Sequence, residues 1–190
     1  MKIYSKTALA FLMVTASVSL AGTPALSHSF NVTLVLPGQP ATSEQARQIR
    51  QGFLLATTER DGHPDEESDG HLGGLDVYVK QADTPAGLDA DIVVLLGSKE
   101  TTGQFTGQVD QNQIAILVPG TTPFSNTENP GVTNFITTYT SAYGSAPTAQ
   151  AAQGYNAARR IAAAIRAQGS ADDKSLLSTS FKQTASSFTW

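Results

Sequence analysis

The sequence predicts a single α/β domain, a three-layer sandwich around a mainly parallel sheet of four strands. Three observations predict this fold class: four short apolar runs rich in β-branched residues, helical patterns between them, and a last third that is helical almost throughout. The apolar runs cover residues 32–36, 75–79, 92–96 and 114–118. Strands that alternate with helices are typical of parallel sheets, because the crossover helices cover both faces of the sheet.

The first two helical patterns follow the first and the third apolar run. Thr42 is the expected N-cap of the first helix, with Gln45 three residues later at the spacing of a capping box. The apolar stripe of this helix consists of Ala46, Ile49, Phe53 and Thr57. The second pattern, over residues 98–110, predicts only a short helix, because Gly103 and Gly107 each cost about 1 kcal/mol relative to Ala.

Three further helices are predicted in the last third of the chain, each delimited by residues that typically cap helices. The expected starts and stops are Asn129 with Pro130 and then Gly144, Pro147 and then Gly169, and finally Ser170 with Asp173 as a capping box. Tyr139, Tyr143 and Tyr155 recur on the apolar stripes of the first two, and we expect them to be core residues. The pattern assigns no role to residues 184–190.

Residues 1–27 have the layout of a secretory signal peptide. Lys2 and Lys6 precede an apolar stretch over residues 8–20, and small residues follow it. The stretch is too short and too polar to span a membrane, so we expect no membrane anchor. Cleavage would leave residues 28–190 as one exported domain, located in the periplasm. The chain contains no cysteine, which excludes disulfides and a lipid-modified cysteine anchor.

Composition and motifs exclude several classes of function. The formal net charge is −4, with 12 Lys and Arg against 16 Asp and Glu, so the chain lacks the basic surface that nucleic-acid binding needs. The sequence has no cysteine nucleophile and no G-x-S-x-G motif. We therefore expect a binding protein rather than an enzyme, and no cofactor.

A binding site is expected where the strands end, because ligands of open parallel sheets bind at the carboxyl ends of the strands. Three loops lie there, over residues 37–40, 97–102 and 119–125. The last two carry small hydroxyl residues beside a helix start or a tight glycine turn, which suits a carboxylate or another small anion. The alternative is that these hydroxyls serve only as caps and turn residues.

Three stretches together resemble a known family. Residues 30–56 contain Q-x-x-x-G-F, residues 92–123 contain I-x-x-x-x-P-G-x-T, and residues 135–181 contain F-x-x-x-Y-x-x-x-Y-G-x-x-P followed by A-x-x-G-Y-x-A. In this order they are similar to the type I periplasmic solute-binding proteins of ABC transporters, in the leucine/isoleucine/valine-binding group. The resemblance implies a Rossmann-like sheet. It also implies that the second lobe of these proteins is missing here, between about residues 125 and 132.

The resemblance implies half of a ligand cleft on a single lobe. In the family, hydroxyls and backbone N–H groups of two loops hold the carboxylate and ammonium of an amino acid. The matching positions here are Ser98, Thr101 or Thr102, and Thr121 or Thr122. The implied function is binding of an amino acid or another small carboxylate-bearing solute. An open alternative is a protein-interaction or assembly role, in which a second copy or a partner protein covers the former lobe interface.

The link over residues 61–74 is too polar and too rich in glycine to be a helix. Within it, His63 and His71 occur with five carboxylates: Asp61, Asp65, Glu66, Glu67 and Asp69. Such residues bind zinc, copper, manganese or calcium, but their spacing matches no known metal motif. The sequence leaves two interpretations, a solvated acidic loop or a metal site, and assigns no metal ligand.

Overall fold

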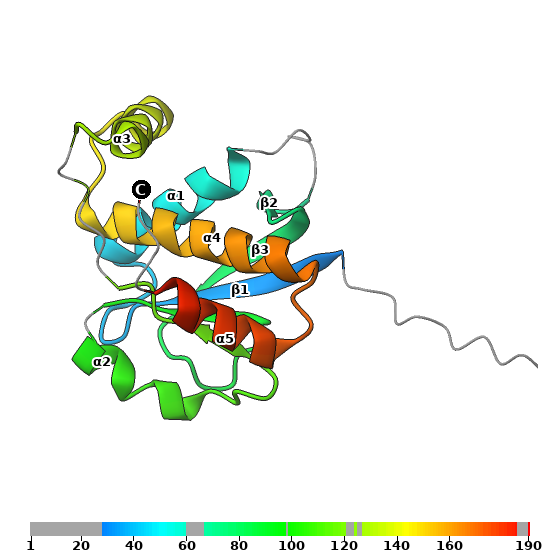
Figure 1. Ribbon diagram of the computed structural model, residues 1–190. Helices are drawn as coiled ribbons and strands as arrows, with labels where there is room; N and C mark the ends of the chain where they lie inside the picture. Colours follow the sequence, from blue (N-terminus) through cyan, green and yellow to red (C-terminus); the bar gives the residue numbers. More distant parts are fainter. Residues whose placement is uncertain (1–27, 60–66, 98, 121–123, 125–126, 186–189) are drawn as a thin grey trace, which may run out of the picture.

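The computed structural model of the chain describes residues 28–59, 67–97, 99–120, 124, 127–185 and 190. The elements, drawn in Figure 1, follow in the order β1 (Ser29–Val35), α1 (Glu44–Thr58), β2 (His71–Leu72), β3 (Leu75–Ala82), β4 (Ile92–Leu95), α2 (Lys99–Gly103), the 3-10 turn η1 (Thr106–Gln108), β5 (Ala115–Leu117), α3 (Pro130–Tyr143), α4 (Ala149–Gln168) and α5 (Lys174–Thr184). The predicted alternation of strands and helices, followed by helices alone, is confirmed.

The strands form one sheet in the order β2-β3-β1-β4-β5. β3, β1, β4 and β5 run parallel, and β2 pairs antiparallel with β3. The predicted parallel strands are confirmed, and β2 is a fifth strand that the sequence does not reveal. A strand of two residues in a polar link has no alternation to detect. Its turn into β3 uses Gly73 and Gly74, whose φ angles of 68° and 100° favour glycine.

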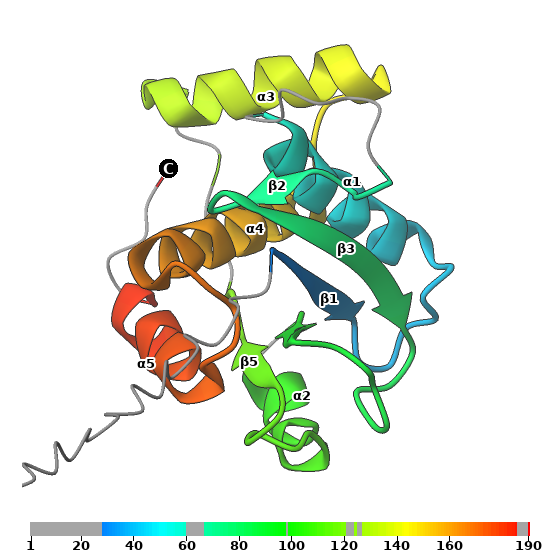
Figure 2. The ribbon, with the colours of Figure 1, turned by 90° about the vertical axis from the view of Figure 1, so that its right-hand side faces the viewer.

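Apolar side chains cover both faces of the sheet, which confirms the three layers. On one face α1, α4 and α5 pack on the strands, and Phe53, Ile161 and Leu177 are buried examples from each helix in turn. On the other face Phe105 and Val109, which flank η1, pack on the side chains of β1 and β4. Figures 1 and 2 show α4 and α5 side by side over the first face.

α1 and α4 pack backbone to backbone at two glycines. Gly52 of α1 faces the carbonyl oxygen of Ala151, and Gly154 of α4 faces the carbonyl oxygen of Ile49. A Cβ at either glycine would overlap the facing oxygen, so no larger residue fits unless a helix moves. Cα–H···O contacts are typical of helices that approach this closely. The contact joins the middle of α1 to the first two turns of α4.

α3 packs against α1 and α4 and not against the sheet, as Figures 1 and 2 show. Phe135 and Tyr139 of α3 are buried beside Tyr155 of α4. The hydroxyl of Tyr139 donates to Oε1 of Gln51, and the hydroxyl of Tyr143 donates to the carbonyl oxygen of Gln51, both at 2.9 Å. The expectation of core tyrosines is confirmed for Tyr139 and Tyr155, while Tyr143 is half-buried.

Trp190 completes this aromatic cluster. Its ring centroid lies 5.0 Å from that of Phe135 and 5.8 Å from that of Tyr155, and the planes of Trp190 and Tyr155 are inclined by only 16°. The ring of Phe124 lies 6.5 Å from that of Trp190. The structure therefore gives Trp190 a packing role between α3 and α4, where the sequence pattern assigned none.

Several predicted helix ends are confirmed. Asn129 caps α3, Pro130 is its first residue, and Gly144 ends it. Gly169 ends α4. The weak pattern over residues 98–110 forms only α2, with five residues, and η1, with three. The low helix propensity of its two glycines accounts for this break.

Three predicted helix starts are wrong by one to three positions. The observed N-caps are Ser43 instead of Thr42 for α1, Thr148 beside Pro147 for α4, and Asp173 instead of Ser170 for α5. The side chains of these N-caps accept hydrogen bonds from the amides of Ala46, Ala151 and Leu176, respectively. Each wrong residue lies close to another good capping residue, so the local sequence does not decide which of the two is used.

We expect Gly154→Ala to lower the free energy of unfolding by about 2 kcal/mol or more, because the added methyl group must displace a helix backbone in a close-packed core. Chemical denaturation followed by circular dichroism measures this change. Gly103→Ala is the matched control, because a Cβ there meets nothing within 4 Å and alanine favours the helix. Equal effects of the two substitutions would contradict the close contact.

We expect stability to fall as the pH rises above about 10, the pKa of a free tyrosine. Burial raises the pKa of Tyr139 and of Tyr143. The unfolded chain therefore releases these protons first, and alkaline pH favours unfolding. Fluorescence of Trp190, the single tryptophan, follows urea unfolding at each pH. A Tyr139→Phe/Tyr143→Phe variant should lose much of the pH dependence, and an unchanged dependence would argue against this origin.

Candidate functional site

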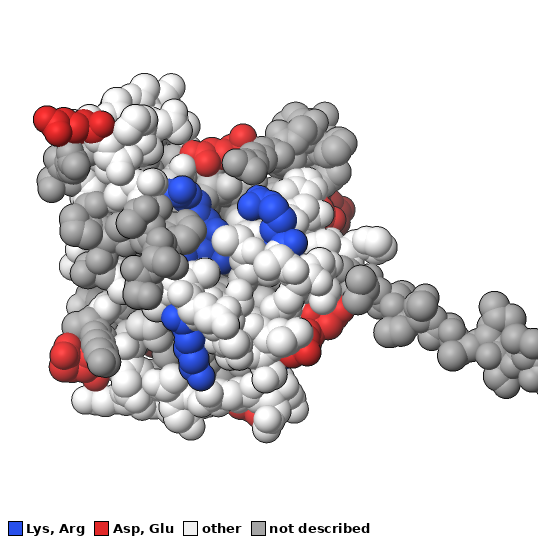
Figure 3. Space-filling model, viewed as in Figure 1, with Lys and Arg blue, Asp and Glu red and all other residues white. Residues whose placement is uncertain are grey.

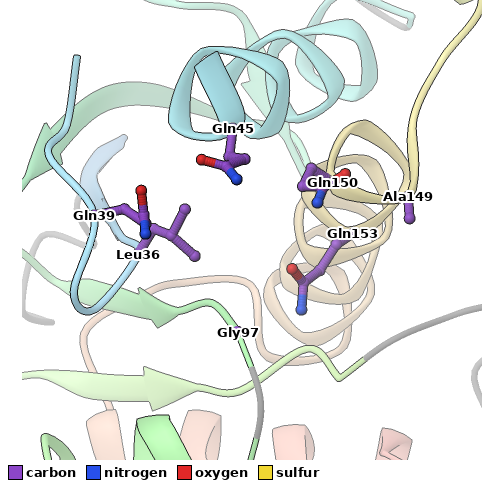
Figure 4. Close-up of a pocket in the computed structure, with 7 residues that line it drawn as sticks. All are labelled: Leu36, Gln39, Gln45, Gly97, Ala149, Gln150 and Gln153. Carbon is purple, nitrogen blue, oxygen red and sulfur yellow. The ribbon is translucent and has the colours of Figure 1, made fainter. Parts of the chain in front are cut away.

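A cavity of about 330 Å³ lies at the carboxyl edge of the sheet, between β1, β4 and the starts of α1 and α4. The described residues that line it are Leu36, Gln39, Gln45, Gly97, Ala149, Gln150 and Gln153 (Figure 4). Leu36 directly follows β1, and Gly97 follows β4 by two residues. The predicted location of a site at the strand ends is therefore matched by a cavity, which contacts two of the three expected loops.

The sheet topology explains why the cavity opens here. The chain passes from β1 to β3 on one side and then to β4 on the other side of β1. Loops after β1 and β4 consequently leave in opposite directions, and a crevice forms between them. Small-molecule sites of doubly wound sheets lie in this crevice.

The amino-terminal ends of two helices meet at the cavity. Gln45 is the second residue of α1, and Ala149 and Gln150 are the first two residues of α4. The backbone amides at these positions have no acceptor within their own helix. The hydroxyl of Thr148 donates to Oε1 of Gln48 at 2.7 Å and so links the two helix starts. Both helices direct the positive end of their dipole toward the cavity.

Gln153 extends from α4 into the cavity, as Figure 4 shows. The residue is only 7% exposed, and Nε2 donates to the carbonyl oxygen of Gly120 at 3.0 Å. A carbonyl only accepts hydrogen bonds, so the amide nitrogen has to face Gly120. The amide oxygen is thereby left as an acceptor for the cavity. Sequence reasoning missed Gln153, because a glutamine inside a helix gives no local sign of such a contact.

Arg160, two turns further along α4, anchors the segment after β5. Its guanidinium donates to the carbonyl oxygens of Val118 and Pro119 at 3.2 and 3.3 Å, and to that of Phe181 in α5. Arg160 is 4% exposed, and this burial lowers the pKa of the guanidinium. Arg160 and Gln153 together fix residues 118–120 against α4.

The structure does not settle whether the five hydroxyl residues predicted to bind a ligand do so. Ser98, Thr121 and Thr122 lie outside the described residues. Thr101 and Thr102 lie in α2, and Thr102 is 2% exposed and does not line the cavity. Their assignment to the ligand stays a prediction. The described part of the cavity is built instead from glutamine side chains and helix starts.

The link with the histidines is described only from residue 67 onward, so His63 lies outside the described residues. Nε2 of His71 lies 2.7 Å from Oδ1 of Asp76. Asp69 accepts from the amide of Val79 at 2.8 Å and contacts Arg50 at 3.2 Å. Within the described ranges, no group of three or more His, Cys, Asp or Glu is arranged to hold a metal ion. Metal binding by this link stays one of the two interpretations of the sequence, beside a solvated acidic loop.

Figure 3 shows one face of the molecule, on which the Lys and Arg side chains are separated by uncharged surface. No helix in the described part of the chain combines the length and the apolar character that crossing a bilayer requires.

Solved structures similar to this chain include three amino-acid binding proteins. The leucine-binding protein LivK from Thermotoga maritima has 11% identity and a TM-score of 0.48, with 81% of this chain and 87% of that chain covered. An amino acid ABC transporter substrate-binding protein from Pseudomonas fluorescens Pf-5 has 14% identity and a TM-score of 0.28, with 81% and 46% covered. The branched-chain amino acid transporter substrate-binding protein LivJ from Streptococcus pneumoniae, in complex with isoleucine, has 14% identity and a TM-score of 0.28, with 81% and 49% covered.

The chain spans about half the length of the second and third of these proteins. No protein-family model matches the chain, and no curated protein matches it.

Proposed function

We propose that this chain is an exported solute-binding protein of the amino-acid ABC-transporter type, and that a small carboxylate-bearing solute binds in the cavity at the carboxyl edge of the sheet. The observation that carries the proposal is the meeting of the amino-terminal ends of α1 and α4 at one cavity. The parts of the proposal that concern transport and a periplasmic location are supported by the sequence resemblance and by the pattern of residues 1–27.

Backbone amides at helix starts are donors for carboxylates, and the helix dipole adds to the attraction. One helix end contributes about 0.3–1 kcal/mol toward an exposed anion, and up to about 2 kcal/mol when the anion is partly buried. Here two helices of 15 and 20 residues act on the same space. None of the described lining residues carries an acidic group that would oppose an anion.

The lining also supports a small solute with an apolar part. Leu36 and Ala149 provide apolar surface, while Gln39, Gln45, Gln150 and Gln153 provide donors and acceptors. Gln39, Gln45 and Ala149 are exposed, so the cavity is open on one side. Because tight sites bury 70–90% of a ligand, we expect weak binding unless another surface closes the cavity.

The open side favours one second candidate, the protein-interaction role. A second copy or a partner protein would cover the rim formed by the exposed residues of the cavity. Light scattering over a concentration series, with and without solute, decides between the two. A monomer at all concentrations that binds no other protein would exclude this role.

We expect Ala149→Glu to weaken carboxylate binding about tenfold or more, because the negative charge of the new glutamate at the start of α4 repels the carboxylate of the solute. Thermal shift and calorimetry with millimolar monocarboxylates measure this effect. An acidic residue in the first turn stabilises a helix, so the fold is expected to be intact. Ala149→Gln is the control, with a similar shape and no charge, and should retain more of the affinity.

Two results would contradict the proposal. The first is the absence of any response to carboxylates in the unchanged protein. The second is equal affinity in Ala149→Glu and Ala149→Gln, which would show that the solute does not bind at the helix starts.

A further inference from the structure

We infer that the solute carries an uncharged hydrogen-bond donor beside its carboxylate, so that the cavity selects a 2-hydroxy acid over the corresponding 2-amino acid. This inference rests on the function proposed above and specifies the class of its ligand. It follows from three features: the fixed amide of Gln153, the positive potential at the cavity, and the uncharged lining.

Gln153 requires a donor on the solute. The bond from its Nε2 to Gly120 fixes the amide and leaves Oε1 as the group that faces the cavity. Gln153 is only 7% exposed, and a solute that displaces water from Oε1 without donating to it leaves this acceptor unpaired, at a cost of about 1–3 kcal/mol. A solute whose hydroxyl reaches Oε1 removes this cost, whereas a keto group or a methylene group does not.

The spacing along α4 suits a donor next to a carboxylate. Gln153 follows Ala149 by four residues, which places it about 6 Å further along the helix axis and on the same side. A carboxylate at the amides of Ala149 and Gln150 can therefore bind with its neighbouring carbon toward Gln153. A hydroxyl on that carbon comes within reach of Oε1.

The potential at the cavity disfavours an ammonium group. The positive ends of the α1 and α4 dipoles both act there. Glu44, in the first turn of α1, opposes this potential, but its carboxylate is paired with Arg47. Arg160 lies about 10 Å beyond Gln153 along the axis of α4, and its buried guanidinium adds to this potential. Its described hydrogen bonds go only to carbonyl oxygens and to the hydroxyl of Thr184, so no carboxylate in them neutralises it.

The described lining offers no anionic partner for an ammonium group, because it consists of leucine, glycine, alanine and glutamine residues. Transfer of an unpaired charge from water into such a site costs far more than transfer of a hydroxyl that finds an acceptor. The same glutamine amide that accepts from a hydroxyl supplies only a dipole to a cation. The 2-hydroxy acid therefore gains the hydrogen bond without the cost of a second charge.

Calorimetry with four solutes on one carbon skeleton tests the inference: 2-hydroxy-4-methylpentanoate, leucine, 2-oxo-4-methylpentanoate and 4-methylpentanoate. We expect the hydroxy acid to bind about tenfold or more tightly than leucine, and also more tightly than the keto and unsubstituted acids. The same series on the three-carbon skeleton (lactate, alanine, pyruvate and propionate) separates this effect from the fit of the side chain.

Gln153→Glu and Gln153→Met provide a matched pair of variants. The glutamate supplies a negative charge for an ammonium group and should shift the preference toward leucine. The methionine removes the acceptor and should abolish the difference between the hydroxy and unsubstituted acids. Fluorescence of Trp190 and thermal unfolding check that each variant folds, and the solute series on the unchanged protein remains decisive if one does not.

The outcomes separate the inference from the proposed function. Leucine binding as tightly as the hydroxy acid, or more tightly, overturns the inference while carboxylate binding in the cavity stands. Equal binding of all four acids also overturns it. No binding of any acid on either skeleton overturns the proposed function, and the inference with it.

Discussion

The contact between Gly52 and Gly154 is the constraint on which the rest of the site depends. It brings the backbones of α1 and α4 together, with each glycine against a carbonyl oxygen of the other helix. Because this contact lies near Ile49 and Ala151, it fixes the two helix starts beside each other and above the ends of β1 and β4. Side chains at this point would separate the helix starts, and the cavity between them would lose its shape.

α4 connects this contact to the sheet, to α3, to α5 and to the segment after β5. It packs on the sheet through Ile161 and on the aromatic cluster of α3 through Tyr155. Arg160 and Gln153 link it to residues 118–120, and Arg160 also reaches α5. Two buried polar side chains in a helix are costly unless they find partners, and these find carbonyl oxygens at the end of β5. The cavity wall and the core are thus held by the same helix.

The sequence predicts the parts of this structure that depend on local patterns. The four parallel strands are recognisable as apolar runs, and Gly144 and Gly169 end their helices because they adopt a left-handed conformation there. β2 is too short to produce a pattern. Gln153 and Arg160 acquire their roles only when a segment more than 30 residues away lies against α4, as the separation of 33 residues between Gly120 and Gln153 illustrates. The strand-end location of the cavity was predictable from topology, but its glutamine lining was not.

The attachment of α3 has a consequence for how the molecule opens. α3 meets the remainder of the described structure through aromatic rings, the side chain of Ile136 and two tyrosine hydroxyls, and it contributes no residue to the sheet core. A unit with few contacts of its own can detach at a lower free energy than global unfolding requires. Such a partly open form would retain the parallel strands and the cavity. It would expose Tyr155 and Leu55, and an exposed apolar surface of this kind promotes aggregation.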